Sequence, residues 1–195
     1  AGRYKVEVSN GAGMVTSREA ILAINTVPTV PTKGGATSKD TPMSISSAKL
    51  LQGVTDPDGD PFALDSVASI SASGGGIAPA GAGVYTYTPP AGFTGLDTFT
   101  FNVRDSRGGI GVGMVEVLVV SGALPTQNQV LMMTTPNGVL VRFAGIPGRN
   151  YQVQRSTDLN NWTTLITLPA PPHGILEYED TMELPAAFYR TASTP

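Results

Sequence analysis

Apolar and polar side chains alternate without a break in the stretch Phe99-Thr100-Phe101-Asn102-Val103. Successive side chains of a β-strand point to opposite faces, so this stretch predicts a strand with one buried and one solvated face. The same alternation recurs in runs bordered by Gly, Pro, Asn or Asp, namely residues 4–8, 84–88, 139–143 and 151–155. Short strands at roughly 8–12-residue spacing, without helices between them, are typical of β-sandwiches. The sequence therefore predicts an all-β chain of tandem Greek-key β-sandwich modules, with one helical turn at residues 47–51.

Composition narrows the classes of partner and chemistry. The 195 residues include 12 Lys and Arg against 15 Asp and Glu, a net charge of −3. Nucleic-acid phosphates are bound by clustered Lys and Arg, and the basic residues here are scattered, so we expect no nucleic-acid partner. The chain has no Cys, which excludes disulfides, thiolate nucleophiles and Cys-based zinc sites. No apolar run approaches ~18 residues, so we expect no membrane span.

Two segments are predicted to separate the modules. Residues 26–37 open with Thr26-Val27-Pro28-Thr29-Val30-Pro31-Thr32, whose spaced prolines favour an extended, semi-rigid backbone. Residues 122–128 follow a strongly apolar predicted strand at 115–120. The predicted order is a hairpin at 1–25, a linker at 26–37, a β-sandwich at 38–121, a linker at 122–128 and a β-sandwich at 129–195.

The first segment resembles the end of a bacterial immunoglobulin-like domain. In that family a D-x-G-x-Y-x-C/V strand turns through S-N-x-x-G into the last strand, and Gly2, Tyr4, Val6 and Ser9-Asn10-Gly11-Ala12-Gly13 match. The resemblance implies that residues 15–24 form that last strand. An isolated hairpin is marginally stable. Two interpretations follow: the hairpin is part of a larger domain, or it docks on another surface.

The middle segment resembles the cadherin-like tandem repeats of bacterial adhesins and large secreted proteins. The matching stretches are Lys39-Asp40-Thr41-Pro42-Met43, Thr55-Asp56-Pro57-Asp58-Gly59-Asp60-Pro61, Phe93-Thr94-Gly95-Leu96-Asp97-Thr98-Phe99 and Val103-Arg104-Asp105-Ser106-Arg107-Gly108-Gly109. The resemblance implies a β-sandwich in an extracellular or cell-surface protein. This chain departs from the family pattern at Arg107, where Asn or Gly is more frequent, and at Lys39, where an acidic residue is.

The acidic loop Asp56-Pro57-Asp58-Gly59-Asp60 is the best candidate site. Calcium takes six to eight oxygen ligands in flexible geometry, and alternating carboxylates in a turn converge on one point. Asp105 ends a predicted strand and Asp40 lies near the start of the module, so both could approach the loop at one pole of the sandwich. The predicted Ca²⁺ ligands are Asp56, Asp58, Asp60, Asp105 and Asp40.

A plain turn remains the alternative interpretation of this loop, because Asp-Pro-Asp-Gly is ordinary turn chemistry. The loop is no EF-hand, since no Glu follows at position twelve and no helices flank it. Asp97 is expected to be a turn or strand residue rather than a ligand.

The C-terminal segment resembles a fibronectin type III-like sandwich found at the C-termini of large secreted bacterial proteins. Its family pattern matches Tyr151-Gln152-Val153-Gln154, Ser156, Asp158 and Trp162, and it closes with Phe188-Tyr189-Arg190. Trp162 is expected to pack on the core with its indole N–H bonded at the edge. The alternative is an exposed platform on which a sugar stacks.

No constellation of residues indicates catalysis. His173 is the single histidine, its loop is expected at the surface, and no G-x-S-x-G elbow accompanies it. Glu177, Glu179, Asp180 and Glu183 lie around one predicted strand and turn, which favours a solvated face over a paired-carboxylate site.

We therefore expect a non-catalytic structural or adhesive segment of a bacterial secreted or cell-surface protein, with a calcium-stiffened middle module. Its expected partners are other domains of the same large protein and a cell-surface or glycan target. One alternative is an accessory, carbohydrate-binding region of a secreted hydrolase. Another is a filament subunit that donates its N-terminal hairpin to the sandwich edge of a neighbouring copy.

Overall fold

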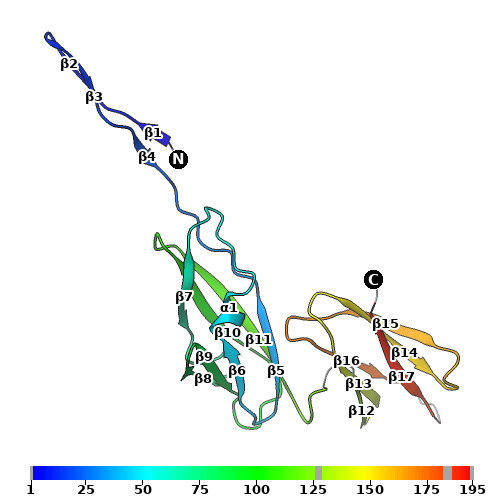
Figure 1. Cartoon of the computed structure of the whole chain (residues 1–195). Helices are drawn as coiled ribbons and strands as arrows, with labels where there is room; N and C mark the ends of the chain where they lie inside the picture. The colour runs from blue at the N-terminus through cyan, green and yellow to red at the C-terminus, as the bar shows by residue number, and fades with distance from the viewer. Residues whose placement is uncertain (1, 126–128, 182–185, 194–195) are drawn as a thin grey trace.

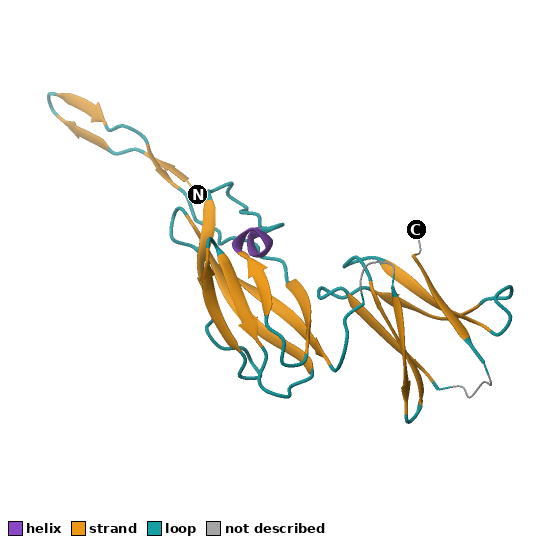
Figure 2. Cartoon of the chain, turned by 60° about the horizontal axis from the view of Figure 1, so that its bottom comes forward, coloured by secondary structure: helices purple, strands orange, loops and turns teal. Residues whose placement is uncertain are grey.

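The computed structural model of the chain describes residues 2–125, 129–181 and 186–193. It contains an extended N-terminal ribbon followed by two β-sandwiches (Figures 1 and 2), which confirms the all-β prediction. The helical turn predicted at 47–51 is helix α1 (Ser47–Leu51). Among the described residues no helix is long enough to cross a membrane.

The N-terminal ribbon consists of two short antiparallel pairs. Strand β1 (Gly2–Tyr4) pairs with β4 (Ala20–Leu22), and β2 (Glu7–Asn10) pairs with β3 (Gly13–Thr16). The prediction of one continuous strand at 15–24 is therefore wrong. Ser17 interrupts it, because its hydroxyl accepts a hydrogen bond from Val6 N at 2.9 Å in place of a regular ladder. The apolar side chains of Tyr4, Val8 and Val15 remain 58–74% exposed.

The middle sandwich is made of a four-stranded and a three-stranded sheet. The sheet orders are β5-β11-β10-β7 and β6-β9-β8, with β5 parallel to β11 and all other pairs antiparallel. The strands are β5 (Lys33–Ser38), β6 (Met43–Ser46), β7 (Phe62–Val67), β8 (Gly76–Gly81), β9 (Val84–Thr88), β10 (Gly95–Asp105) and β11 (Ile110–Val120).

The segment expected to be a linker at 26–37 is integrated into this sandwich. Thr29 forms a β-bridge with Thr55, and Pro28 packs against Gly111 of β11. Strand β5 has no apolar alternation, because it is a glycine-rich edge strand, and so its sequence gave no strand signal.

The core of the middle sandwich follows the predicted alternation. Phe99, Phe101 and Val103 of β10 are at most 3% exposed, and alternate residues of β11 pack against them. The same two-residue period points Asp97 and Asp105 inward, and they are 1% and 3% exposed.

Asp97 is buried but fully hydrogen-bonded. Its carboxylate accepts hydrogen bonds from the hydroxyls of Ser71 (2.5 Å) and Tyr87 (2.7 Å) and from the backbone N–H groups of Ser73 (2.9 Å) and Thr98 (2.8 Å). Burial raises the pKa of Asp97, but these donors outweigh it, so the pKa lies below its usual value. Asp97 is a structural residue that links β10 to the opposite sheet.

The C-terminal sandwich has three strands in each sheet, in the orders β12-β13-β16 and β15-β14-β17. The strands are β12 (Val130–Thr135), β13 (Gly138–Ala144), β14 (Asn150–Ser156), β15 (Thr163–Pro169), β16 (Ile175–Asp180) and β17 (Phe188–Ser193). Its core is built from Val141, Phe143, Val153 and Leu176. Residues 126–128 of the predicted second linker lie outside the described residues.

Trp162 departs from its expected place in the core. It is half-buried, and its indole N–H donates to Leu159 O at 3.0 Å, as expected. However, one ring face is covered by the Arg190 guanidinium, whose carbon lies 4.2 Å from the ring centroid. This arrangement is a cation–π contact at the edge of the sandwich.

Candidate metal centre

The acidic loop lies at the end of the middle sandwich where β10 ends and β7 begins. Asp105 pairs with Phe62, and Ser106 N donates to Pro61 O at 2.9 Å, so the last strand residue of β10 is held directly beside the loop. One carboxylate oxygen from each of Asp56, Asp58 and Asp60 lies within 4.8 Å of the others. The structure thus brings these three carboxylates and Asp105 to one pole.

The two carboxylate oxygens of Asp56 differ: one forms the turn, and the other is available as a ligand. Its Oδ1 accepts hydrogen bonds from the N–H groups of Asp58 (2.9 Å) and Asp60 (3.1 Å), and Gly59 adopts a φ of 75°. These contacts fix the turn. The other oxygen, Asp56 Oδ2, takes no part in the turn.

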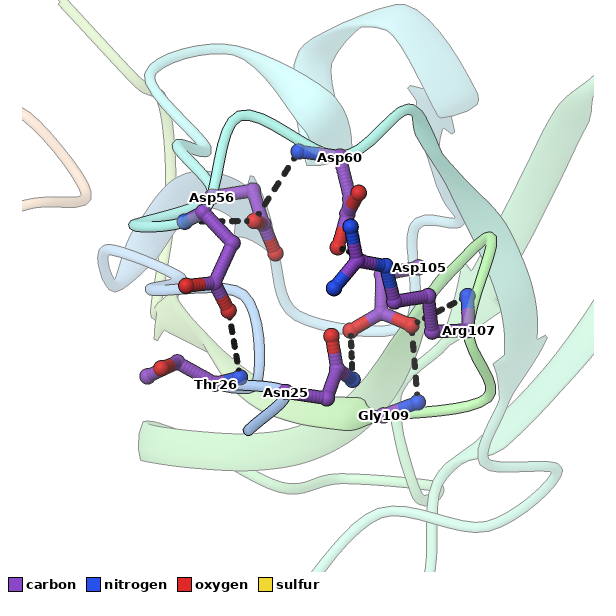
Figure 3. A network of polar contacts seen from close by, with 8 residues as sticks. Asn25, Thr26, Asp56, Asp60, Asp105, Arg107 and Gly109 are labelled. Atoms are coloured by element: carbon purple, nitrogen blue, oxygen red, sulfur yellow. Dashed lines mark hydrogen bonds and ion pairs between the residues drawn. The ribbon is translucent and has the colours of Figure 1, made fainter. Parts of the chain in front are cut away.

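Three buried oxygens at this pole have no hydrogen-bond partner among the described residues: Asp56 Oδ2, Asp60 Oδ2 and Asn25 Oδ1. Buried polar atoms are nearly always hydrogen-bonded, so three such oxygens in one place require an explanation, although Asp60 Oδ2 has an ion pair with Arg107. All three are carboxylate or amide oxygens, which are the ligands that calcium prefers. Figure 3 shows the Asn25 amide oxygen directed into the space between the acidic loop and Asp105.

Asp105 orients Asn25. Its Oδ2 accepts a hydrogen bond from Asn25 Nδ2 at 2.8 Å, and its Oδ1 accepts from the N–H groups of Arg107 and Gly109, each at 2.8 Å. Burial raises the pKa of Asp105, but these donors hold it below its usual value. Because the Asn25 amide nitrogen is committed to Asp105, its oxygen faces the loop.

Asn25 and its neighbour Thr26 were not anticipated from the sequence. Thr26 N donates to Asp58 Oδ2 at 2.5 Å and ties the segment after β4 to the acidic loop, whereas Asn25 ties it to Asp105. No motif surrounds Asn25, and only the fold brings it to the loop. Gly109 leaves room for it, since a side chain there would collide with Asn25 Nδ2.

Arg107 places a positive charge at the site. Its Nε lies 3.1 Å from Asp60 Oδ2, without the geometry of a hydrogen bond, and its side chain is 47% exposed against 11% for Asp60. This charge offsets the repulsion among the clustered carboxylates. Its exposure leaves it room to swing away.

Asp40 is not brought to the site. It follows β5, at the end of the sheet where Ser38 pairs with Val120, whereas Asp105 lies at the opposite end of β10. Asp40 Oδ1 instead accepts a hydrogen bond from Gly92 N at 2.7 Å. The parallel pairing of β5 with β11 explains the separation, because it carries the chain away from the acidic loop before Asp40.

Three of the carboxylates considered for catalysis are engaged in other contacts. Glu177 pairs with Arg142, Glu179 accepts from Thr135, and Asp180 pairs with Arg155, all from β16. The fourth, Glu183, lies outside the described residues. His173 is half-buried, contrary to the expected surface position, and burial holds its pKa below the usual value.

Comparison with known protein families identifies the middle module. Residues 24–120, just under half of the chain, match the cadherin-like domain family. The match begins at Ile24 and therefore includes Asn25, the acidic loop and Asp105. A search of curated protein sequences finds no match.

Several solved structures match parts of this chain at low identity. A nucleoside hydrolase-related hypothetical protein from Saccharophagus degradans is 16% identical, over 49% of this chain and 26% of that one, with a TM-score of 0.34. A Ca²⁺-stabilised adhesin, which helps an Antarctic bacterium to bind ice, is 13% identical over 98% and 55%, with a TM-score of 0.30. A Bacteroides ovatus protein, SGBP-B, in complex with a mixed-linkage heptasaccharide, is 14% identical over 91% and 51%, with a TM-score of 0.27. The chain thus spans about a quarter to a half of these proteins.

Proposed function

We propose that this chain, whose residues 24–120 form a cadherin-like domain, is a non-catalytic structural or adhesive segment of a secreted or cell-surface protein. In this proposal calcium binds at the acidic loop and stiffens the junction between the N-terminal ribbon and the middle sandwich. The observation that carries it is the convergence of three buried oxygens, from the loop and from the segment before it, that accept no hydrogen bond from the described residues.

The ligand set fits calcium rather than a transition metal. Asp56 Oδ2, Asp60 Oδ2 and Asn25 Oδ1 would supply protein oxygens, with Asp58 and Asp105 beside them, and no His or Cys is near. Asn25 belongs to the segment that leads to the ribbon, whereas the aspartates belong to the sandwich. An ion held by both would fix the direction in which the ribbon leaves the sandwich.

A calcium titration by calorimetry tests this proposal. We expect the wild-type chain to bind Ca²⁺ at one site. Asp56→Asn should abolish binding, because Asn keeps an oxygen for the two turn hydrogen bonds but replaces the unpartnered oxygen with an amide group. Asp40→Asn is the matched control, since Asp40 lies at the other pole and its loss should leave binding unchanged. Equal binding by wild type and Asp56→Asn would refute the site.

Replacing Arg107 by the residue more frequent in the family should strengthen calcium binding. Arg107 contacts Asp60 Oδ2 and would repel a divalent cation held by the same oxygen. Removing a unit charge about 6 Å from Ca²⁺ in a wet environment is worth roughly 1.4 kcal/mol, which is about a tenfold lower Kd. We expect this change for Arg107→Asn in the same titration. Arg104→Gln removes a neighbouring charge whose partner is Asp65 and should change the Kd little. An unaltered Kd in Arg107→Asn would show that this charge does not oppose the ion.

The two alternative functions have no observation in their particular favour. The ring of Trp162 has one face covered by Arg190, which leaves no open platform on that face for a sugar. The exposed apolar face of the ribbon suits donation to a second copy, but it is equally expected of the last hairpin of an immunoglobulin-like domain. We propose the latter for residues 1–25.

A further inference from the structure

The middle and C-terminal sandwiches meet at a contact that does not involve the acidic loop. The loop between β15 and β16, residues 170–174, reaches the edge strand β5 of the middle sandwich (Figure 1). A side chain on Gly34 of β5 would overlap the backbone of Pro172 and the N–H of His173. The two backbones are therefore as close as a glycine allows.

The surroundings of Gly34 are formed by residues of both sandwiches. A cavity of about 390 Å³ is lined by Thr32, Lys33 and Gly34 from one module and by Gly148, Ala170 and Pro172 from the other. Lys33 is only 6% exposed, and its ammonium donates to the Gln52 carbonyl, so its charge is not left unsatisfied. Ala170 is 5% exposed.

Further contacts extend the interface beyond Gly34. Leu118 of β11 lines a second cavity, of about 290 Å³, together with His173, Leu176 and Glu177 of the C-terminal module. Arg142, which is 4% exposed, donates to Ala123 O at 3.4 Å, immediately after β11. His173 is half-buried and lines the same cavity as Leu118, which places the loop histidine in the same interface.

We propose that these contacts form a permanent interface, so that the middle and C-terminal sandwiches behave as one rigid unit with or without calcium. The partner surface for the β5–β11 edge is the 170–174 loop of the same chain. Gly34 is the residue that permits the contact. The chain then has two kinds of junction: a calcium-dependent one before the middle sandwich and a metal-independent one after it. The second does not depend on the proposed calcium site.

Gly34→Ala tests the interface, with Gly35→Ala as its matched control. The neighbouring Gly35 points to the other face of β5, where a methyl group would meet only the flexible end of Met43, with its sulfur at 2.7 Å. Both substitutions add one methyl group to the same strand. We expect Gly34→Ala to separate the sandwiches and to increase the maximum dimension measured by small-angle X-ray scattering. Gly35→Ala should scatter as the wild type does. Identical scattering of Gly34→Ala and wild type would overturn the proposal.

NMR relaxation of the wild-type chain provides a test that needs no variant. The backbone amides of residues 33–120 and 138–180 should share one rotational correlation time, both in EDTA and in excess Ca²⁺. Two different correlation times in both conditions would overturn the interface. A common correlation time in Ca²⁺ alone would also contradict it, because that result would make this junction metal-dependent. Neither result would bear on calcium binding by the acidic loop.

Discussion

Asp97→Ala should unfold the middle sandwich under conditions in which the wild type is stable. The substitution leaves two hydroxyls and two backbone N–H groups without their acceptor, in a place where Asp97 is 1% exposed. Each unsatisfied buried donor costs about 1–3 kcal/mol, and partial relaxation brings the total to roughly 3–5 kcal/mol. The midpoint of thermal unfolding should fall by on the order of 15 °C or more. Differential scanning calorimetry measures it.

The control for Asp97→Ala is Asp65→Ala. Asp65 forms an exposed ion pair with Arg104, at 2.7 Å, so its loss should cost under about 1 kcal/mol. The pKa of Asp97 is lowered in the folded state, and its stabilising effect is therefore present at neutral pH and lost as the pH falls below about 4. Wild type should lose stability over that range more steeply than Asp97→Asn. Equal losses of stability in Asp97→Ala and Asp65→Ala would mean that the buried hydrogen bonds of Asp97 contribute no more than an exposed ion pair.

Calcium should raise the melting midpoint of the middle sandwich. A ligand that binds only the folded state stabilises it by about 2.7 kcal/mol at a hundred times its Kd. For a domain of this size that is on the order of 10–20 °C. We expect a low midpoint in EDTA and a higher one after excess Ca²⁺ is added, because the ion satisfies the oxygens of Asp56, Asp60 and Asn25, which accept no hydrogen bond from the described residues.

Two controls separate this shift from a general effect of salt. Magnesium at the same ionic strength should give a smaller shift, because it demands octahedral geometry and gives up its water reluctantly. Asp56→Asn should melt at the same temperature in EDTA and in Ca²⁺. A midpoint that Ca²⁺ leaves unchanged in the wild type would rule out calcium stiffening.

Much of the fold could be predicted from alternation, because the alternating stretches are half-buried strands. The two elements that were predicted wrongly, β5 and the strand at 15–24, do not follow this alternation throughout. Strand β5 is glycine-rich and lies at a sheet edge, and most of it fell within the linker predicted at 26–37. The break at Ser17 comes from a side-chain hydrogen bond, which no pattern of apolar residues encodes.

The candidate site was predictable only in part. Asp56, Asp58 and Asp60 are adjacent in sequence, and their convergence followed from turn chemistry. Asp105 was predicted to approach the loop from the end of its strand. The burial of Asp97 and Asp105 was not predicted, although both lie in the inward register of β10, with Phe99, Phe101 and Val103 between them.

Long-range placement accounts for the remaining errors at the site. Asp40 was assigned to the wrong pole because the direction of β5 depends on its parallel pairing with β11. Asn25 was missed for the same kind of reason, since its contact with Asp105 joins residues far apart in the chain. Such contacts depend on topology and not on local pattern.

In the proposed function, calcium joins the segment before the middle sandwich to the acidic loop. An NMR titration of the ¹⁵N-labelled chain with Ca²⁺ tests this most directly. We expect the side-chain amide of Asn25 and the backbone amides of Thr26, Asp58 and Asp60 to shift together with one common Kd. The backbone amide of Gly92, which is held by Asp40 at the other pole, should stay in place. Resonances of Asn25 and the acidic loop that do not move at saturating Ca²⁺ would contradict the claim.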